Sequence, residues 1–361
     1  MQSKFRLLVV RLGAMGDILH ALPAVTALRL AHPGWQIDWV VDPAWLPLLT
    51  TEPASTRGPA HRDPKQPLVD NIHSAAVKAW VRSPLSWKTS REISHLRRTL
   101  RAARYEAVLD FQGAVRSALI ARLTSCQRVI GEADPREPVA KWLFTERVET
   151  RGVHVIEQDV EVASAVVGDT LEPVLPLLPA DPAAQAWCDT LLGARRGLAS
   201  QPPIVLLNPG AGWGAKRWPV NRYAQVARQL AERGFAVVVN AGPGETELAE
   251  TIRVQSGGAA LAVACSLSQL IALTRRISLA IAGDTGPLHL ACALGKPVIG
   301  IFGPTDPARN GPYGTRFRVL RSTESKRDHT RRAEPEAGLL TIQPEDVLQA
   351  ADELLAEEAV R

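Results

Sequence analysis

The sequence predicts an α/β protein of two Rossmann-like domains with parallel sheets, and three observations lead to this prediction. The chain has 361 residues, more than one compact core usually holds, so two domains are expected. Short β-branched runs alternate with glycine-containing loops and helical patterns, which is typical of βα units. This rhythm starts near residue 7 and again near residue 204, which indicates two halves of similar size.

The first half opens with a βαβ unit. Residues 7–10 (LLVV) read as a buried strand, a loop with two glycines follows, and apolar residues recur at helical spacing from residue 19 to residue 30. Residues 37–41 predict the next strand. The other elements expected in this half are strands at 75–80, 107–111 and 128–130 and helices at 90–103 and 115–123.

A proline-rich segment separates the two halves. Six prolines lie between residues 171 and 203, around one helical stretch at 183–192. We therefore interpret residues 176–203 as a linker region between an N-terminal domain, 1–175, and a C-terminal domain, 204–342.

The second half repeats the pattern and ends in a helix. Its expected strands are 204–207, 236–239, 279–282 and 298–302, and its expected helices are 223–232, 245–253, 267–274 and 288–294. Residues 321–336 are polar and mixed in charge, as in a solvated loop. The last segment, 343–361, predicts an amphipathic helix because its apolar residues recur on one face.

Composition excludes several classes of protein. Hydrophobic residues make up 46% of the chain and charged residues 22%, which excludes wholesale disorder. A net charge of +5 suits an anionic partner, but no aromatic-plus-basic motif accompanies it, so nucleic acid is not expected. The four cysteines lack the spacing of a zinc site and are expected to be buried thiols in a reducing compartment.

Neither a signal peptide nor a membrane span is expected. The apolar run at 7–10 is too short for a secretory signal, and no apolar stretch is long enough to cross a bilayer. We expect a cytoplasmic protein whose membrane contact is peripheral. Between residues 76 and 130, eleven Lys and Arg stand against three acidic residues, a basic face that fits a phosphorylated or carboxylated substrate at a membrane surface.

The first candidate site is the turn after the first strand, where Gly13 and Gly16 precede Asp17. Glycines in such a turn let a ligand approach the backbone, and a helix N-terminus stabilises the ionised carboxylate that a general base needs. Two other interpretations stay open. Asp17 can simply cap the helix, or the turn can bind a dinucleotide with Asp42 on a ribose, although only G-x-x-G of the usual G-x-G-x-x-G is present.

Two glycine-rich segments of the second half are candidate anion sites. Residues 208–219 (NPGAGWGAKRWP) place three glycines before Lys216, as a phosphate-holding loop would, although the spacing is not that of a Walker A loop. Residues 283–290 (GDTGPLHL) would aim the N–H groups near Thr285 and Gly286 at an anion. A solvated turn and a helix-capping aspartate are the structural interpretations that compete with these.

A shorter turn at residues 240–245 (NAGPGE) ends in Glu245 at the expected start of a helix. Its carboxylate can bind a ribose hydroxyl or merely cap the helix.

These motifs stand in the order and spacing of a known family. RLGAMGDILHALP, NPGAGWGAKRWP, GPGE, GDTGPLHLACALGKP and FGPTDP together resemble the bacterial ADP-heptose:lipopolysaccharide heptosyltransferases, glycosyltransferase family 9, over nearly the whole chain. DFQGAVRSALIARL, REPVAKWLF and HVIEQ are most similar to heptosyltransferase I, which adds the first heptose to the Kdo–lipid A inner core. The resemblance implies a GT-B architecture, two Rossmann-like domains facing a central cleft, in which the C-terminal helix can pack back on the N-terminal domain.

The resemblance also implies a reaction. The family transfers L-glycero-D-manno-heptose from ADP-heptose with inversion and without a required metal or other cofactor. The implied acceptor is Kdo–lipid A at the inner face of the cytoplasmic membrane, and no obligatory protein partner is implied. The alternatives are a nucleotide-sugar epimerase or a transferase of another sugar on the same fold, an NAD-dependent oxidoreductase, which the incomplete glycine fingerprint disfavours, and a non-catalytic nucleotide-sugar-binding protein.

Residue roles follow from the matched motifs. Asp17 is implied to be the catalytic base, with Gly16 beside it on the acceptor side. The donor-binding positions of the family are matched by Gly212, Lys216, Glu245, Asp284, Thr285, Gly286 and His289, among which the lysine would neutralise the diphosphate and the glutamate would contact the nucleoside. The basic acceptor-binding positions are matched by Lys78, Arg82 and Arg136. The loop before the lysine carries Ala211 and Gly212 where hydroxyl side chains are usual, so a phosphate contact there would use the backbone.

Overall fold

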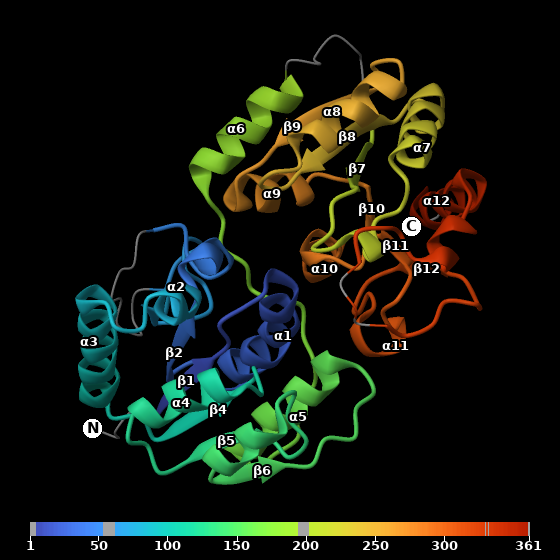
Figure 1. The fold of residues 1–361 in the computed structure, drawn as a ribbon. Helices are drawn as coiled ribbons and strands as arrows, with labels where there is room; N and C mark the ends of the chain where they lie inside the picture. The colour runs from blue at the N-terminus through green and yellow to red at the C-terminus, as the bar shows by residue number, and fades with distance from the viewer. Residues whose placement is uncertain (1–4, 53–61, 194–201, 329, 331, 360–361) are drawn as a thin grey trace. The chain divides into compact units, whose positions relative to one another are not determined.

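The computed structural model describes residues 5–52, 62–193, 202–328, 330 and 332–359. The chain forms two compact units, Met1–Ala180 and Asp181–Arg361, each built around one parallel six-stranded sheet (Figure 1). Part of the expected linker region, residues 194–201, lies outside the described residues.

The sheet of the first unit has the strand order β3-β2-β1-β4-β5-β6, with every neighbouring pair parallel. Its strands are β1 (Arg6–Val10), β2 (Gln36–Val41), β3 (Asn71–Ser74), β4 (Ala107–Asp110), β5 (Val129–Glu132) and β6 (Glu146–Val148). This is the order of a Rossmann sheet, in which the chain reverses direction across the sheet between β1 and β4. Ligands of such sheets bind outside the carboxyl ends of the strands at that point.

Helices connect the strands of the first unit and cover the sheet. They are α1 (Met15–Ala31), η1 (Pro43–Leu48), α2 (Val77–Arg82), α3 (Trp87–Ala103), α4 (Val115–Leu123), η2 (Pro138–Leu143) and α5 (Val155–Val167). Side chains from α2, α3, α4 and η2 join one apolar cluster with the residues of β1 and β4 that point to that face. The central strands are therefore buried on both faces, which explains why they read as continuous apolar runs.

The second unit repeats this topology with the order β12-β11-β10-β7-β8-β9, also all parallel. Its strands are β7 (Ile204–Asn208), β8 (Ala236–Ala241), β9 (Ala260–Ala264), β10 (Leu279–Gly283), β11 (Val298–Phe302) and β12 (Phe317–Arg321). Its helices are α6 (Pro182–Gly193), η3 (Gly214–Lys216), α7 (Val220–Glu232), α8 (Thr246–Gln255), α9 (Leu267–Thr274), α10 (Gly286–Ala293), α11 (Pro307–Asn310), η4 (Ala337–Leu340) and α12 (Pro344–Ala359).

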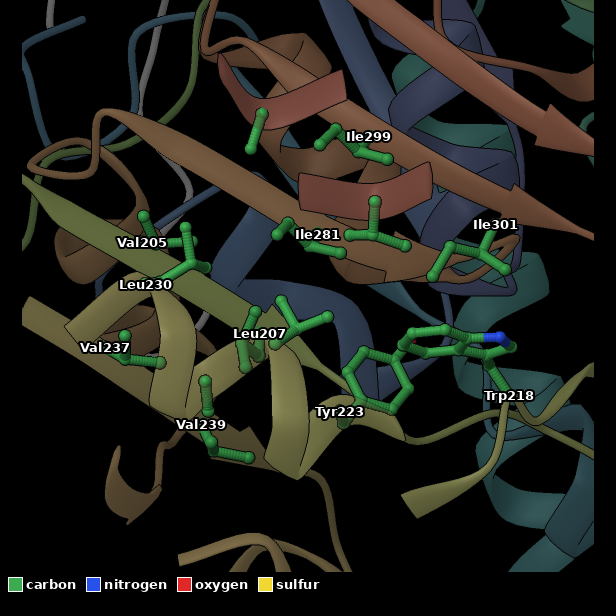
Figure 2. Packing of buried hydrophobic residues seen from close by; sticks show 14 of the residues in the cluster. Val205, Leu207, Trp218, Tyr223, Leu230, Val237, Val239, Ile281, Ile299 and Ile301 are labelled. Carbon is green, nitrogen blue, oxygen red and sulfur yellow. The ribbon is translucent and has the colours of Figure 1, made fainter. Parts of the chain in front are cut away.

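The core of the second unit is a continuous apolar cluster (Figure 2). The strands contribute β-branched and leucine side chains, and Trp218 and Tyr223 pack edge to face at a ring separation of 4.9 Å. The Trp218 indole N–H donates to the carbonyl oxygen of Ile342 at 3.1 Å, so the loop ahead of α7 is tied to the segment that leads into α12. This contact anchors one end of the glycine-rich segment 208–219 in the core.

The C-terminal helix, which the resemblance allows to pack back on the N-terminal domain, has its apolar face in the core of the second unit. The apolar face of α12 joins the core of the second unit through Val347, Ala351 and Leu354, and the helix lies beside α7 (Figure 1). Burial of Val347 and of Leu354 contributes about 1.5–3 kcal/mol each, which is the physical reason for this placement.

The expected strand at 75–80 is wrong. The strand of this region is β3, four residues earlier, and Val77–Arg82 is the helix α2. In α2, Trp80 points into the core while Lys78 and Ala79 face solvent. Six residues are too few for the helical period of apolar residues to be recognised in the sequence. Four further elements, β6, α5, β9 and β12, were not predicted from the sequence.

Candidate active-site residues

Asp17 lies in the first turn of α1, directly after the carboxyl end of β1. Its Oδ2 accepts a hydrogen bond from the backbone N–H of Ala14 at 2.9 Å, and its Oδ1 lies 3.5 Å from Nη2 of Arg11. The side chain is 35% exposed. The capping interpretation is therefore correct for one carboxylate oxygen, while the group as a whole stays accessible to a ligand.

Gly13 allows this turn to take its shape. Its φ is +149°, and a Cβ atom at this position would collide with the indole of Trp45. Any other residue would be strained and would displace the tryptophan. The backbone at Gly13 passes close to the Trp45 indole and leads directly into α1, which carries Asp17 in its first turn. Gly16, in the first turn of α1, is partly exposed beside it.

A buried polar group on the neighbouring strand supports the same corner. Asp110 ends β4, and its Oδ1 accepts from the backbone N–H of Gln112 at 2.8 Å, that of Gly113 at 2.9 Å and the Ser117 hydroxyl at 3.1 Å. Burial raises the pKa of Asp110 to about 6, against the lowering effect of these hydrogen bonds and of Arg11. No role for this residue was predicted from the sequence; an aspartate at a strand end, three residues before a glycine, was the available signal.

The predicted acceptor-side cations lie on separate elements. Lys78 and Arg82 are exposed on α2, which follows β3. Arg136 is exposed in the loop after β5, and its backbone nitrogen packs closely against Gly113. Within the described residues, no hydrogen bond or ion pair joins any of these three to Asp17. The structure therefore places them around the carboxyl edge of the sheet without bringing them into one cluster.

The second unit brings three predicted residues into direct contact. Lys216 Nζ lies 2.5 Å from Asp284 Oδ2, and His289 Nε2 lies 3.2 Å from Asp284 Oδ1. The lysine comes from η3, after β7, and the other two flank the start of α10, after β10. Since β7 and β10 are neighbours at the centre of the sheet, the cluster occupies its switch point.

The electrostatics of this cluster fix Asp284 as a carboxylate. Burial alone would raise its pKa, but the hydrogen bond from His289 and the charge of Lys216 outweigh burial and lower the pKa below its ordinary range. An ionised carboxylate only accepts, so Nε2 of His289 donates. Lys216 Nζ also donates to the carbonyl oxygen of Asp284 at 3.3 Å and lies 4.5 Å from the Trp213 ring. The ammonium group is thus held in place from several sides.

The start of α10 lies beside this cluster. Thr285 is the N-cap residue of the helix and Gly286 its first residue, so their N–H groups belong to the helix N-terminus. The Thr285 hydroxyl donates to the carbonyl oxygen of Gly283 at 3.2 Å. A cation and a helix N-terminus together form an arrangement that suits a diphosphate.

Glu245 lies in a second group of contacts in this unit. Its Oε2 accepts from the backbone N–H of Gly242 at 3.1 Å, its Oε1 lies 3.9 Å from Arg217 Nη2, and its carboxylate packs against Gly210. Arg217 follows Lys216 directly, so the loop before α7 connects this group with the ion-pair cluster. Gly212 is exposed, with open space where a Cβ would stand, so its backbone is accessible.

The described part of the chain holds neither a metal-binding cluster of side chains nor a membrane-spanning helix. In that part, no group of three or more His, Cys, Asp or Glu residues is arranged to hold a metal ion. None of the helices described there has the length and apolar character needed to cross a membrane.

Comparisons with known proteins agree with the motifs. The family model "Glycosyltransferase family 9 (heptosyltransferase)" matches residues 93–339. Lipopolysaccharide heptosyltransferase 1 of Pseudomonas aeruginosa is 29% identical over 323 residues, 86% of this chain and 81% of that protein. The Escherichia coli K12 protein of the same name is 28% identical, over 88% and 93% of the two chains.

Solved structures show the same fold. The structure of the E. coli heptosyltransferase WaaC with ADP superposes with a TM-score of 0.76 at 24% identity, covering 97% of this chain and 100% of that one. A glycosyl transferase family 9 structure from Veillonella parvula gives a TM-score of 0.77 at 20% identity, over 99% of each chain. These similarities establish the GT-B architecture of two Rossmann-like domains.

Proposed function

Because the chain belongs to glycosyltransferase family 9 (heptosyltransferase), we propose that it transfers L-glycero-D-manno-heptose from ADP-heptose to Kdo of the Kdo–lipid A inner core. It is a glycosyltransferase of the heptosyltransferase family, whose curated relatives are lipopolysaccharide heptosyltransferases. The proposal adds the donor, the acceptor, inversion at the anomeric carbon and independence of metal. It also assigns acceptor binding to the first unit and donor binding to the second.

The single observation that supports the proposal most strongly is the environment of Asp17. A general base must be ionised, held in one orientation and open to the hydroxyl group that it deprotonates. The N–H of Ala14 and the guanidinium of Arg11 orient the carboxylate, while the side chain remains 35% exposed. In the same unit Asp110 is buried with a raised pKa and cannot reach a substrate.

The proposed reaction is one displacement. As the acceptor hydroxyl oxygen attacks the anomeric carbon, its proton passes to the carboxylate of Asp17, and the bond between that carbon and the diphosphate oxygen breaks. ADP leaves with the bonding electron pair, so negative charge grows on the diphosphate. Inversion follows from a single attack on the face opposite the leaving group, and no second carboxylate is needed as a nucleophile.

Donor binding and leaving-group stabilisation are proposed for the cluster around Lys216. Its ammonium group and the N–H groups at the start of α10 can both face the diphosphate. Asp284 would not contact the donor but would hold the Lys216 ammonium group in position, and His289 would hold the Asp284 carboxylate. We propose that Glu245, beside the glycine loops, contacts the nucleoside.

The acceptor side and the location are further parts of the proposal. Lys78, Arg82 and Arg136 would contact the anionic groups of Kdo–lipid A, and Gly16 would lie beside the attacking hydroxyl. An acceptor with a lipid anchor requires the protein to work at a membrane surface, so we propose peripheral association with the inner face of the cytoplasmic membrane.

A transfer assay tests this function. We expect ADP release from ADP-heptose only when a Kdo–lipid A acceptor is present, at a rate that EDTA leaves unchanged. Conversion of the donor sugar without acceptor would identify an epimerase instead. Failure to release ADP with any Kdo acceptor would contradict the proposal.

A further inference from the structure

The connection between α2 and α3 exposes three large apolar side chains within seven residues. Val81 is 74% exposed, Leu85 is 97% exposed and Trp87 is 76% exposed. Single exposed apolar residues are ordinary on a protein surface, but three of this size in one short segment indicate a contact surface.

This segment is held in its shape by the residues beneath it. Trp80 packs into the core of the first unit, and its indole N–H donates to Glu92 Oε2 at 2.7 Å, which ties α2 to α3. The Thr89 hydroxyl donates to the carbonyl oxygen of Ser83 at 2.9 Å. The exposure of the three apolar residues therefore follows from a hydrogen-bonded turn rather than from a loose segment.

The surroundings of the apolar residues are strongly basic. Residues 77–104 contain eight Lys and Arg, and Glu92 is the one acidic residue of this segment. One carboxylate against eight cations leaves the segment with a large positive charge. The Arg91 guanidinium lies 5.9 Å from the Trp87 ring centre, which places a cation directly beside the exposed aromatic ring.

We propose that Val81, Leu85 and Trp87 insert into the headgroup region of an anionic lipid bilayer while the surrounding cations contact its phosphates. The proposal rests on the proposed function, because a bilayer that holds the acceptor's acyl chains is the surface in question. Tryptophan favours the membrane interface, aliphatic side chains gain by leaving water, and each nearby cation is attracted to anionic lipid. A second copy of this chain is a poorer occupant, since two such basic faces would repel each other.

Vesicle binding by the full chain tests the surface. The variant L85S/W87S should bind vesicles of phosphatidylcholine with 30% phosphatidylglycerol about tenfold or more weakly than the unchanged protein, because it removes the two most exposed apolar groups. The control is L30S/V153S, which removes two other exposed apolar side chains of the same unit, 62% and 66% exposed. This control should bind within about twofold of the unchanged protein.

Further measurements separate this proposal from the proposed function. Pure phosphatidylcholine vesicles should bind the protein weakly, since they lack the anionic charge. The rate of transfer to a water-soluble, deacylated Kdo acceptor should be the same in L85S/W87S and the unchanged protein. This assay needs no membrane, so it tests the proposed catalytic function separately from the membrane surface. Equal vesicle binding by L85S/W87S and L30S/V153S would overturn the proposed membrane surface. The proposal would also be overturned if the unchanged protein sedimented as an oligomer and L85S/W87S as a monomer. That result would identify the surface as an interface between two copies of this chain.

Discussion

Asp17 and Asp284 lie at the switch points of the two parallel sheets, but on different strands. Asp17 follows β1, whose counterpart in the second unit is β7, whereas Asp284 follows β10, the counterpart of β4. Their environments differ. The Asp17 side chain is 35% exposed and has one cation at 3.5 Å, whereas the Asp284 side chain is 8% exposed and contacts both Lys216 and His289. Two sheets of the same topology thus hold one accessible carboxylate, Asp17, and one buried carboxylate, Asp284, whose two oxygens contact a lysine and a histidine.

The difference shows how one fold serves two tasks. A carboxylate whose pKa is lowered by two partners holds a proton poorly and is suited to positioning a cation. A carboxylate with an exposed face can meet a substrate hydroxyl and accept its proton. Partner number and burial separate the proposed base from the proposed lysine holder, and each aspartate follows a different strand of its sheet.

The largest effect is expected from Asp17→Asn. The amide keeps the hydrogen bond from Ala14 but cannot accept the proton, so turnover should fall by about a hundredfold or more with little change in donor affinity. Steady-state kinetics with saturating ADP-heptose measures this. The control is Asp42→Asn, which changes another capping aspartate of the same unit and should leave turnover within about twofold. Near-normal transfer by Asp17→Asn would remove this residue as the base.

Lys216→Ala comes next. It removes a charge proposed to contact the diphosphate in both the bound donor and the transition state, so donor affinity and turnover should each fall, by roughly ten- to a hundredfold. Titration calorimetry with ADP-heptose measures the affinity. Lys216→Arg keeps the charge and should recover part of the loss. Unchanged donor affinity in the alanine variant would exclude the lysine from the site.

Asp284→Asn should have a smaller effect on the same quantities. Loss of the carboxylate leaves Lys216 less well positioned, so donor affinity should fall about tenfold while the chemical step is affected only through donor placement. Thermal unfolding should show destabilisation, because the buried cation loses its partner. Asp352→Asn breaks an exposed ion pair with Arg233 and serves as the control; it should change neither quantity measurably. Full donor affinity in Asp284→Asn would refute the positioning role.

The smallest effect concerns pH and stability at Asp110. Because its pKa is raised to about 6 in the folded state, its contribution to stability is present below its unfolded pKa and is lost as pH rises through about 6. Asp110→Asn removes this ionisation. The unfolding free energy of the variant should therefore depend less on pH, between about 4 and 6, than that of the unchanged protein. Chemical denaturation at several pH values measures this. Parallel pH profiles for the variant and the unchanged protein would contradict the raised pKa.

The central strands were predictable because burial on both faces makes their sequences uniformly apolar, as in β1 and β11. Edge strands were not, since β6 and β12 lie partly exposed and mix arginine or glutamate with apolar residues. The α2 segment was assigned to the wrong class because six residues are too few to distinguish a helical period from a strand.

The candidate site was predictable as a set of segments but not as a set of contacts. Glycine-rich turns after strands indicated the corners that hold Asp17, Lys216 and Asp284. The ion pair between the last two joins residues far apart in the chain, and it depends on β7 and β10 lying side by side, which no local pattern reveals. Residue type alone could not tell the open aspartate from the engaged one.

The division of roles between the two aspartates is tested most directly by measuring two quantities on the same two variants. Single-turnover heptose transfer and ADP-heptose affinity should be determined for Asp17→Asn and Asp284→Asn alongside the unchanged protein. The account predicts that Asp17→Asn loses rate and keeps affinity, whereas Asp284→Asn loses affinity and regains most of its rate at saturating donor. The opposite assignment, or the same loss in both variants, would contradict it.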